Sequence, residues 1–309
     1  MLYPRASAAR RVTDLGGMWK FCLDWDGKGD QEGWKDGIPG TEKIPVPASF
    51  NDFYTDKDIR EFAGDFWYET EVFVPGEWRK MHVDLRFAAL THRGTVYVNG
   101  QEVISHEGGF LPFSARIDDV VRWNEKNLVV VKGNNELSFT SLPAGFTQTL
   151  KSGKKMIRPF FDFFNYAGIQ RPVKLVALPK EYIEDFTVNH RLDGTTAYVD
   201  YQMETTGNHP VTVEVFDENG SFVTKAEGKT GTITIPEARL WEVRDAYLYR
   251  FVLKIMDGDA VIDEYEEEIG IRTFEIQGNS FILNGHPVYL KGFGKHEDSD
   301  IVGRGYNPG

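Results

Sequence analysis

Alternation of apolar and polar residues with a period of two is the feature that most restricts the fold of this chain. Four short alternating runs, separated by turn residues, are "FWYETEVFVP" (66–75), "MHVDLRF" (81–87), "GTVYVNGQEVISHEG" (94–108) and "NLVVVKGNNEL" (127–137). Such runs are typical of half-buried β-strands. Asn99-Gly100, between "TVYV" and "QEVISH", is the strongest short-range hairpin signal. We therefore expect an all-β protein made of sandwiches or jelly rolls.

Helical periodicity is almost absent before the last part of the chain. No long stretch repeats apolar residues at the spacing of a helix face, so few helices are expected. The segment "SFNDFYTDKDIREFAG" (49–64) has room for one helical turn. The tryptophans Trp19, Trp67, Trp123 and Trp241 are interpreted as sandwich core.

A change in composition near Pro179 separates two groups of alternating runs. Residues 181–273 contain roughly seven short strands with turns at "LDG", "TGNHP" and "DENG", which is the count of an immunoglobulin-like sandwich. The inter-sheet disulfide of antibody domains is absent, because Cys22 is the single cysteine. We expect one β-domain in residues 1–180 and an immunoglobulin-like β-sandwich in residues 181–273.

Residues 274–309 differ from the preceding runs in their sequence pattern. They contain a second Asn-Gly turn, in "FILNGHPV", and then a short apolar run, "VYLKGFG", that leads into a charged loop. A lone hairpin and one strand do not make a stable domain. We expect this segment to be the beginning of a third unit that is cut off at Gly309, and not an ordinary frayed tail, because tails are usually polar.

Charge and cysteine content exclude several classes of function. The net charge of −12 disfavours nucleic acid and anionic membrane surfaces as partners. No thiolate metal site can be built from one cysteine, His92 and His106 have no metal-ligand spacing, and no nucleotide-binding glycine pattern is present. The chain has no run of about twenty apolar residues and no secretory signal. We expect a soluble, cytoplasmic protein with no metal, no cofactor, no nucleic acid and no membrane partner.

Two short stretches combine charged and aromatic residues. "FFDFFNYAGI" (160–169) places Asp162 between two pairs of phenylalanines, where an ionised carboxylate would be costly to bury unpaired. Asp162 is either an exposed turn or cap residue beside core phenylalanines, or a carboxylate held in a pocket. "GFGKHEDSD" places His296 and Glu297 after a short apolar run. They belong either to a solvated charged loop or to a site at the end of a strand.

Several stretches in the same order along the chain resemble glycoside hydrolase family 2: "LGGMWKF", "VPASFND", "GDFWYETEVFVP", "RFAALTHRGTVYVNGQEV", "HEGGFLPFSARI", "DFFNYAGIQRPV" and "FILNGHPVYLKGFGKHEDSD". Within that family, "DFFNYAGI" and "GFGKHED" are most similar to the β-glucuronidase branch. The resemblance implies three parts: a jelly-roll sugar-binding domain (1–180), an immunoglobulin-like sandwich (181–273), and the first hairpin and strand of a truncated TIM barrel (274–309).

The same resemblance implies a retaining glycosidase that cleaves β-D-glucuronides with two glutamates, one the nucleophile and one the acid/base. Both glutamates would lie beyond Gly309, so we expect no catalytic residue in this chain and no activity from it alone. By resemblance, Asp162 hydrogen-bonds a sugar hydroxyl, His296 lines the sugar pocket, and Glu297 helps to order that pocket. The implied partner is a small-molecule glucuronide or another saccharide, and the full-length protein would be a homo-oligomer.

A non-catalytic module for carbohydrate binding or oligomerisation is the alternative. Jelly rolls commonly bind saccharides on one face, and a fold alone does not fix a function. Titration with saccharides and a mass measurement in solution distinguish these possibilities.

Overall fold

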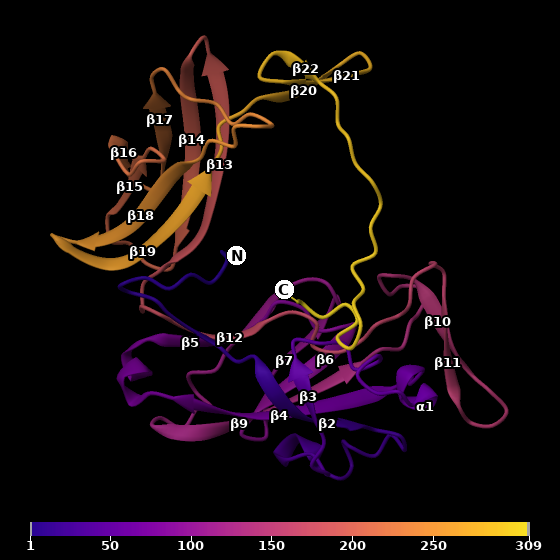
Figure 1. Cartoon of the computed structure of the whole chain (residues 1–309). Helices are drawn as coiled ribbons and strands as arrows, with labels where there is room; N and C mark the ends of the chain where they lie inside the picture. Colours follow the sequence, from indigo (N-terminus) through magenta and orange to yellow (C-terminus); the bar gives the residue numbers. More distant parts are fainter. Residues whose placement is uncertain (1, 308–309) are drawn as a thin grey trace. The chain divides into compact units, whose positions relative to one another are not determined.

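The computed structural model describes residues 2–307, which divide into two compact units (Figure 1). One unit contains residues 12–177 together with the segment that begins at Lys295, and the other contains the N-terminal residues through Arg11 together with Leu178–Gly294. The described residues form twenty-two β-strands and a single α-helix of four residues. The prediction of an all-β fold is therefore confirmed.

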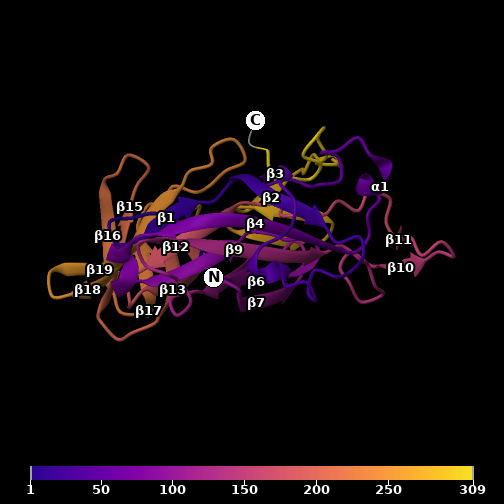
Figure 2. The same cartoon turned by 90° about the horizontal axis from the view of Figure 1, so that it is seen from below.

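The unit of residues 12–177 is a sandwich of two sheets. Its strands are β1 (Arg11–Asp14), β2 (Gly17–Leu23), β3 (Lys43–Val46), β4 (Asp65–Val74), β5 (His82–Phe87), β6 (Arg93–Val98), β7 (Gln101–Glu107), β8 (Phe113–Arg116), β9 (Glu125–Asn134) and β12 (Val173–Leu178). One sheet has the order β3-β2-β4-β9-β6-β7 and the other β1-β12-β5-β8. Figure 2 shows β4 beside β9, with β6 and β7 beyond it. Neighbours that are far apart in sequence give the sandwich a jelly-roll type of connection.

Alternation along the strands explains where the core of this sandwich lies. In β5 every second residue, Val83, Leu85 and Phe87, is fully buried between the sheets. Burying a side chain of this size stabilises the fold by about 1.5–3 kcal/mol. Trp19 is fully buried in this core, as predicted, whereas Trp67 is buried in a separate cluster and Trp123 and Trp241 are only partly buried.

The outer face of the six-stranded sheet carries a second, smaller apolar cluster. Ile38, Trp67 and Val130 pack there with Trp34, which belongs to the short 3-10 helix η1 (Trp34–Asp36). The loop before β3 thus covers part of this face.

Local turn chemistry forms as the sequence predicts. Asn99 and Gly100 both have positive φ angles, 51° and 80°, in the two-residue turn between β6 and β7, where Val98 pairs with Gln101. The expected helical turn is α1 (Lys57–Arg60), capped by the side chain of Asp56. A hairpin of β10 (Gly145–Thr149) and β11 (Lys155–Pro159) completes this unit.

The other unit contains a seven-stranded, immunoglobulin-like sandwich. Its strands are β13 (Ile183–Asp193), β14 (Thr196–Thr205), β15 (Val211–Phe216), β16 (Phe222–Glu227), β17 (Thr230–Ile235), β18 (Tyr249–Asp257) and β19 (Ala260–Ile269). The sheet orders are β13-β14-β17 and β16-β15-β18-β19. Residues such as Val199, Val213 and Phe251 are fully buried between the two sheets.

A buried ion pair fixes the N-terminal segment to this sandwich. Arg10 donates from Nε and from a terminal nitrogen to both carboxylate oxygens of Asp263, at 2.8 and 2.5 Å. The N–H of Ile183 also donates to Asp263, and Arg10 donates to the carbonyl of Ile183. Both charges are thus buried and hydrogen-bonded. Residues 2–11, expected to begin the first domain, group with the sandwich for this reason.

After the sandwich, a small meander is made of β20 (Phe274–Gln277), β21 (Ser280–Leu283) and β22 (His286–Val288). Its second turn is the predicted Asn284-Gly285 pair, with φ angles of 50° and 81°. Of the apolar run 288–294, expected as a strand, only Val288 lies in a strand, as the end of β22; the rest has no regular structure, and Tyr289 and Phe293 are 83% and 90% exposed. No strand of the described residues pairs with residues 289–294, and an unpaired strand is not stable.

No helix among residues 2–307 has the length and apolar character needed to cross a membrane.

Candidate functional site

The predicted site residue Asp162 lies in the segment 160–170, which leaves β11 and contains no strand. Asp162 is exposed, and so is Phe160, while the rings of Phe161 and Phe163 stack with centroids 4.1 Å apart. The carboxylate therefore lies at the surface among aromatic rings, where a ligand can reach it. Burial of all four neighbouring phenylalanines in a core, one of the two interpretations left open by the sequence, is not observed.

Two side-chain hydrogen bonds of Asn165 anchor this segment. Its amide oxygen accepts a hydrogen bond from His92 Nε2 at 2.6 Å, and its amide nitrogen donates to the carbonyl of Asn135 at 3.2 Å. His92 Nδ1 is buried and has no partner among the described residues. Burial disfavours the charged imidazole, so the pKa of His92 lies below its ordinary value. The neutral form, with its proton on Nε2, fits this hydrogen bond to Asn165.

The end of the segment is held by close backbone packing. Gly168 has a φ of 131°, and a Cβ atom there would lie 2.7 Å from the Tyr68 hydroxyl and 2.8 Å from the carbonyl oxygen of Ala48. The N–H of Ala167 donates to the side-chain oxygen of Asn51 at 2.8 Å. The backbone requires glycine at position 168, and the segment has little freedom to move beyond Asn165.

A polar cluster lies next to this anchor. The Tyr166 hydroxyl donates to Asp52 Oδ2 at 2.7 Å, and Arg60 Nε pairs with Asp52 Oδ1 at 2.6 Å. The guanidinium of Arg60 also covers the ring of Phe164 at 4.1 Å. Burial and the hydrogen bond to Asp52 raise the pKa of Tyr166 to about 12, so Tyr166 stays a neutral donor at physiological pH.

The segment after Lys295 packs against the same region. The carbonyl of Val302 accepts from the N–H of Ser49 at 2.9 Å, and the N–H of Tyr306 donates to the carbonyl of Gln170 at 2.8 Å. The guanidinium of Arg304 covers the ring of Phe163 at 4.3 Å. The stretch 160–169 and the residues from Lys295 onward thus belong to one compact unit, where Arg304 contacts Phe163.

His296 and Glu297 line one hollow of about 360 Å³, together with Arg171, Lys295 and Arg304. Arg171 donates to the carbonyl of Arg304 at 2.7 Å, which fixes the wall of this hollow. His296 and Glu297 are both exposed.

Asp162 is not among the described residues that line this hollow or the neighbouring one of about 290 Å³ beside Phe163, Phe164 and Asn165. His296 and Glu297 line one hollow with Arg304, and Arg304 contacts Phe163 in the stretch that carries Asp162. The roles of Asp162, His296 and Glu297 in binding stay predictions.

Sequence reasoning missed the residues that support this region. Asn165 and Tyr166 stand in the motif "DFFNY", but neither was assigned a role, and His92 was considered only as a metal ligand. No pattern in the sequence indicated a role for Arg304. In the described part of the chain, no group of three His, Cys, Asp or Glu side chains is arranged to hold a metal ion.

Comparison with known proteins identifies the family. Residues 12–179, more than half of the chain, match the sugar binding domain of glycosyl hydrolases family 2. The chain belongs to this family. Residues 181–272 match a further domain of glycosyl hydrolases family 2, and residues 274–308 match the family's TIM barrel domain. The jelly-roll sandwich, the immunoglobulin-like sandwich and the meander are therefore successive parts of a family 2 chain.

Named relatives of this family 2 chain are β-glucuronidases. The β-glucuronidase of Paenibacillus borealis is 39% identical over 313 residues, which cover 99% of this chain and 52% of the relative. The crystal structure of Ruminococcus gnavus β-glucuronidase superposes with a TM-score of 0.97 at 53% identity, over 99% of this chain and 52% of that chain. The same enzyme in complex with D-glucuronic acid matches over 54% of its length with a TM-score of 0.97 and 53% identity. The chain spans about half the length of the curated relatives it matches.

Proposed function

We propose that the protein to which this chain belongs hydrolyses β-D-glucuronides, and that this chain supplies part of the surface that binds the sugar. The observation that carries the proposal is the segment 160–170. It presents the exposed carboxylate of Asp162 from an anchored backbone, next to the segment that carries His296 and Glu297. Support also comes from relatives named β-glucuronidase that match along 99% of the chain.

In this proposal Asp162 accepts hydrogen bonds from sugar hydroxyls, since a carboxylate can accept from two hydroxyl groups at once. His296 lines the sugar pocket, and Glu297 orders it. Asn165 and Gly168 anchor the backbone that follows Asp162, which limits the conformational freedom lost on binding. The contribution of this chain is thus binding and orientation of the sugar.

The reaction itself follows the retaining scheme. One glutamate attacks the anomeric carbon while a second protonates the leaving oxygen, and water then hydrolyses the glycosyl-enzyme bond. We assign neither role to a residue of this chain. By resemblance to family 2, both glutamates belong to later strands of the barrel.

The test is hydrolysis of para-nitrophenyl β-D-glucuronide by the native protein, with the matching β-D-galactoside as control substrate. We expect release of nitrophenol from the glucuronide and at most about a hundredth of that rate from the galactoside. The chain of residues 1–309 alone is expected to show no turnover. Turnover by it at a rate near that of the native protein would contradict the assignment of both catalytic glutamates outside it.

We further propose that the native protein is a cytoplasmic homo-oligomer. The location is supported by the single half-buried Cys22, since a chain with one cysteine gains no intrachain disulfide from an oxidising compartment. Mass measurement in solution and fractionation of the source cells test the two statements separately. A monomeric mass would refute the homo-oligomer, and recovery outside the cytoplasmic fraction would refute the location.

A further inference from the structure

A groove begins on the outer face of the six-stranded sheet and extends toward α1 and the hairpin of β10 and β11, and Asp162 does not line it. It consists of two adjoining hollows of about 440 and 520 Å³, which share Asp65 and Asn134 as lining residues. Each hollow has the size of a typical small-molecule site, about 300–1,000 Å³. Because they adjoin, the groove has room for a ligand longer than one sugar ring.

Strand register explains why this part of the sheet face is polar. Asp65 on β4 pairs with Asn134 on β9, which pairs in turn with Arg93 on β6, so these three side chains form one row across the strands. The next row contains Lys132, Thr95 and Ser105. On the same face, Trp67 stands beside Lys132 in this second row and packs with Ile38 and Val130 under the loop before β3. The sheet face is apolar where the loop covers it and polar where the groove is open.

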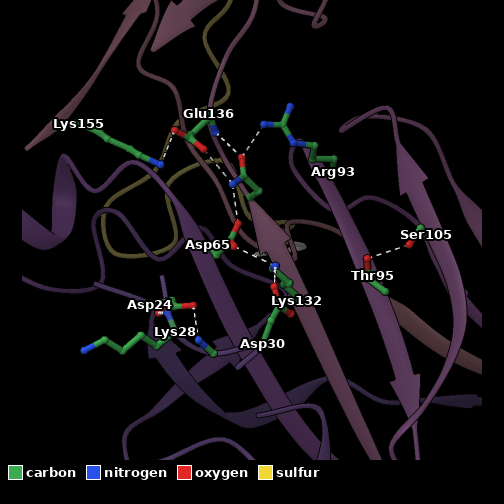
Figure 3. A network of polar contacts seen from close by, with 12 residues as sticks. Asp24, Lys28, Asp30, Asp65, Arg93, Thr95, Ser105, Lys132, Glu136 and Lys155 are labelled. Atoms are coloured by element: carbon green, nitrogen blue, oxygen red, sulfur yellow. Dashed lines mark hydrogen bonds and ion pairs between the residues drawn. The ribbon is translucent and has the colours of Figure 1, made fainter. Parts of the chain in front are cut away.

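The polar side chains of the groove are held in fixed positions (Figure 3). Asn134 donates from its amide nitrogen to Asp65 at 2.6 Å, and Arg93 donates to the amide oxygen of Asn134 at 3.0 Å. Lys132 pairs with the other oxygen of Asp65 at 3.0 Å, and Figure 3 shows these two side chains pointing toward one another. Planar amide and carboxylate groups fixed by their neighbours are preorganised to bind hydroxyl groups.

An aromatic ring stands at the rim of the second hollow. Trp25 lines it and is 59% exposed, with its ring edge-on to Phe62 at a centroid distance of 4.9 Å. The contact with Phe62 supports the indole while more than half of its surface stays open to solvent. An exposed tryptophan that is supported from one side suits stacking against the apolar face of a sugar ring.

The charges of the groove disfavour an anionic ligand. Among its lining residues, acidic side chains (Asp24, Asp26, Asp58, Glu61, Asp65, Glu107 and Glu136) outnumber basic ones (Arg93, Lys132, Lys154 and Lys155). The lysines are already paired: Lys154 with Asp58 at 2.6 Å, and Lys155 with Glu136 at 2.9 Å. A polyanion would have to displace these carboxylates, whereas hydroxyl groups can bind to the free lone pairs of the same oxygens.

We propose that this groove is a second, non-catalytic saccharide site that binds a neutral oligosaccharide. Trp25 stacks on one sugar ring, and the row of Asp65, Asn134 and Arg93 hydrogen-bonds to the hydroxyls of the next. Asp162 does not line this groove, and the second hollow shares Glu61, Phe62, Lys154 and Lys155 with the hollow beside Phe163, Phe164 and Asn165. The groove would hold the protein on a polysaccharide.

The experiment is isothermal titration of the chain with cellohexaose, xylohexaose and mannohexaose, and with heparin as the polyanion. We expect at least one neutral hexasaccharide to bind with a Kd of about 1 mM or tighter. Trp25→Ala should weaken that binding at least about tenfold, because it removes the stacking surface. Asn134→Ala should weaken it as well, and Asp162→Ala should leave it unchanged.

Phe73→Ala is the matched control, since Phe73 is an exposed aromatic residue of β4 that does not line the groove. It should bind like the unmodified chain. Thermal unfolding of each variant shows whether it is folded, and the conservative variant Trp25→Phe, which keeps a ring, should retain part of the affinity. Absence of binding to all three hexasaccharides, binding that survives Trp25→Ala, or tighter binding of heparin would each overturn the proposal.

Discussion

Two carboxylates of this molecule, one buried and one exposed, lie in opposite environments. Asp263, in the immunoglobulin-like unit, is fully buried, and Arg10 and the N–H of Ile183 occupy its oxygens. Asp162, in the jelly-roll unit, is exposed among aromatic rings on a segment that is anchored from Asn165 onward. A buried carboxylate must be paired, so its partners report on stability. An exposed carboxylate on an anchored segment is free to bind a ligand, so its position reports on function.

The largest effect is expected from breaking the buried pair. Asp263→Ala leaves the charge of Arg10 buried without its partner, and such a loss costs about 3–5 kcal/mol of unfolding free energy. Urea unfolding followed by circular dichroism measures it. We expect the transition of the immunoglobulin-like unit to move to lower urea while that of the jelly-roll unit stays in place.

The double variant Arg10→Met, Asp263→Leu provides the control for this prediction. It removes both charges and fills the space with apolar groups, so it should recover most of the lost stability. A cost below about 1 kcal/mol for Asp263→Ala would show that the pair does not hold the N-terminal segment.

A smaller loss of stability is expected when the hydrogen bond from the Tyr166 hydroxyl to the partly buried carboxylate of Asp52 is removed. Tyr166→Phe removes the hydroxyl that donates to Asp52 and should lower the unfolding free energy by about 1–2 kcal/mol. Urea unfolding of the jelly-roll unit is the measurement. Tyr97→Phe, which removes a hydroxyl from a half-buried tyrosine of the same unit, should change it by less than about 0.5 kcal/mol. Equal effects of the two variants would rule out a special role of the bond to Asp52.

Local signals in the sequence were sufficient for much of the fold. The period of two predicts the strands, and the pairs Asn99-Gly100 and Asn284-Gly285 predict two hairpins, because a two-residue turn depends only on its own residues. The expected strand at 289–294 is absent because a strand also needs a neighbour, which its own residues do not specify.

Contacts between distant residues could not be predicted in the same way. Arg10 and Asp263 lie 253 positions apart, and no local pattern links them. The row of Asp65, Asn134 and Arg93 exists only through the register of three strands. For Asp162 the motif named a candidate whose role stays a prediction, and whether it is buried or exposed depends on packing by segments far along the chain.

The third prediction concerns how the stability of the jelly-roll unit depends on pH through His92, which binds Asn165. Burial lowers the pKa of His92 below its ordinary value of 6.5, so the unfolded chain binds a proton that the folded one excludes in this range. The stability of the jelly-roll unit should therefore fall as the pH is lowered through 6.5 and level off below the folded pKa. Urea midpoints between about pH 5 and 8 measure this. His92→Gln should flatten the dependence, and an unchanged slope in that variant would refute the assignment to His92.

The smallest effect on stability is expected at Asp162, and it is the sharpest test of the comparison. Asp162→Ala should change the unfolding free energy by less than about 0.5 kcal/mol, because the carboxylate is exposed. In the native protein the same change should raise KM for a β-D-glucuronide about tenfold or more through the lost hydrogen bonds to sugar hydroxyls. Asp119→Ala, at another exposed aspartate of this unit, should alter neither quantity. If Asp162→Ala destabilised the unit as much as Asp263→Ala destabilises its own, then Asp162 would also be structural, and exposure would no longer distinguish the two carboxylates.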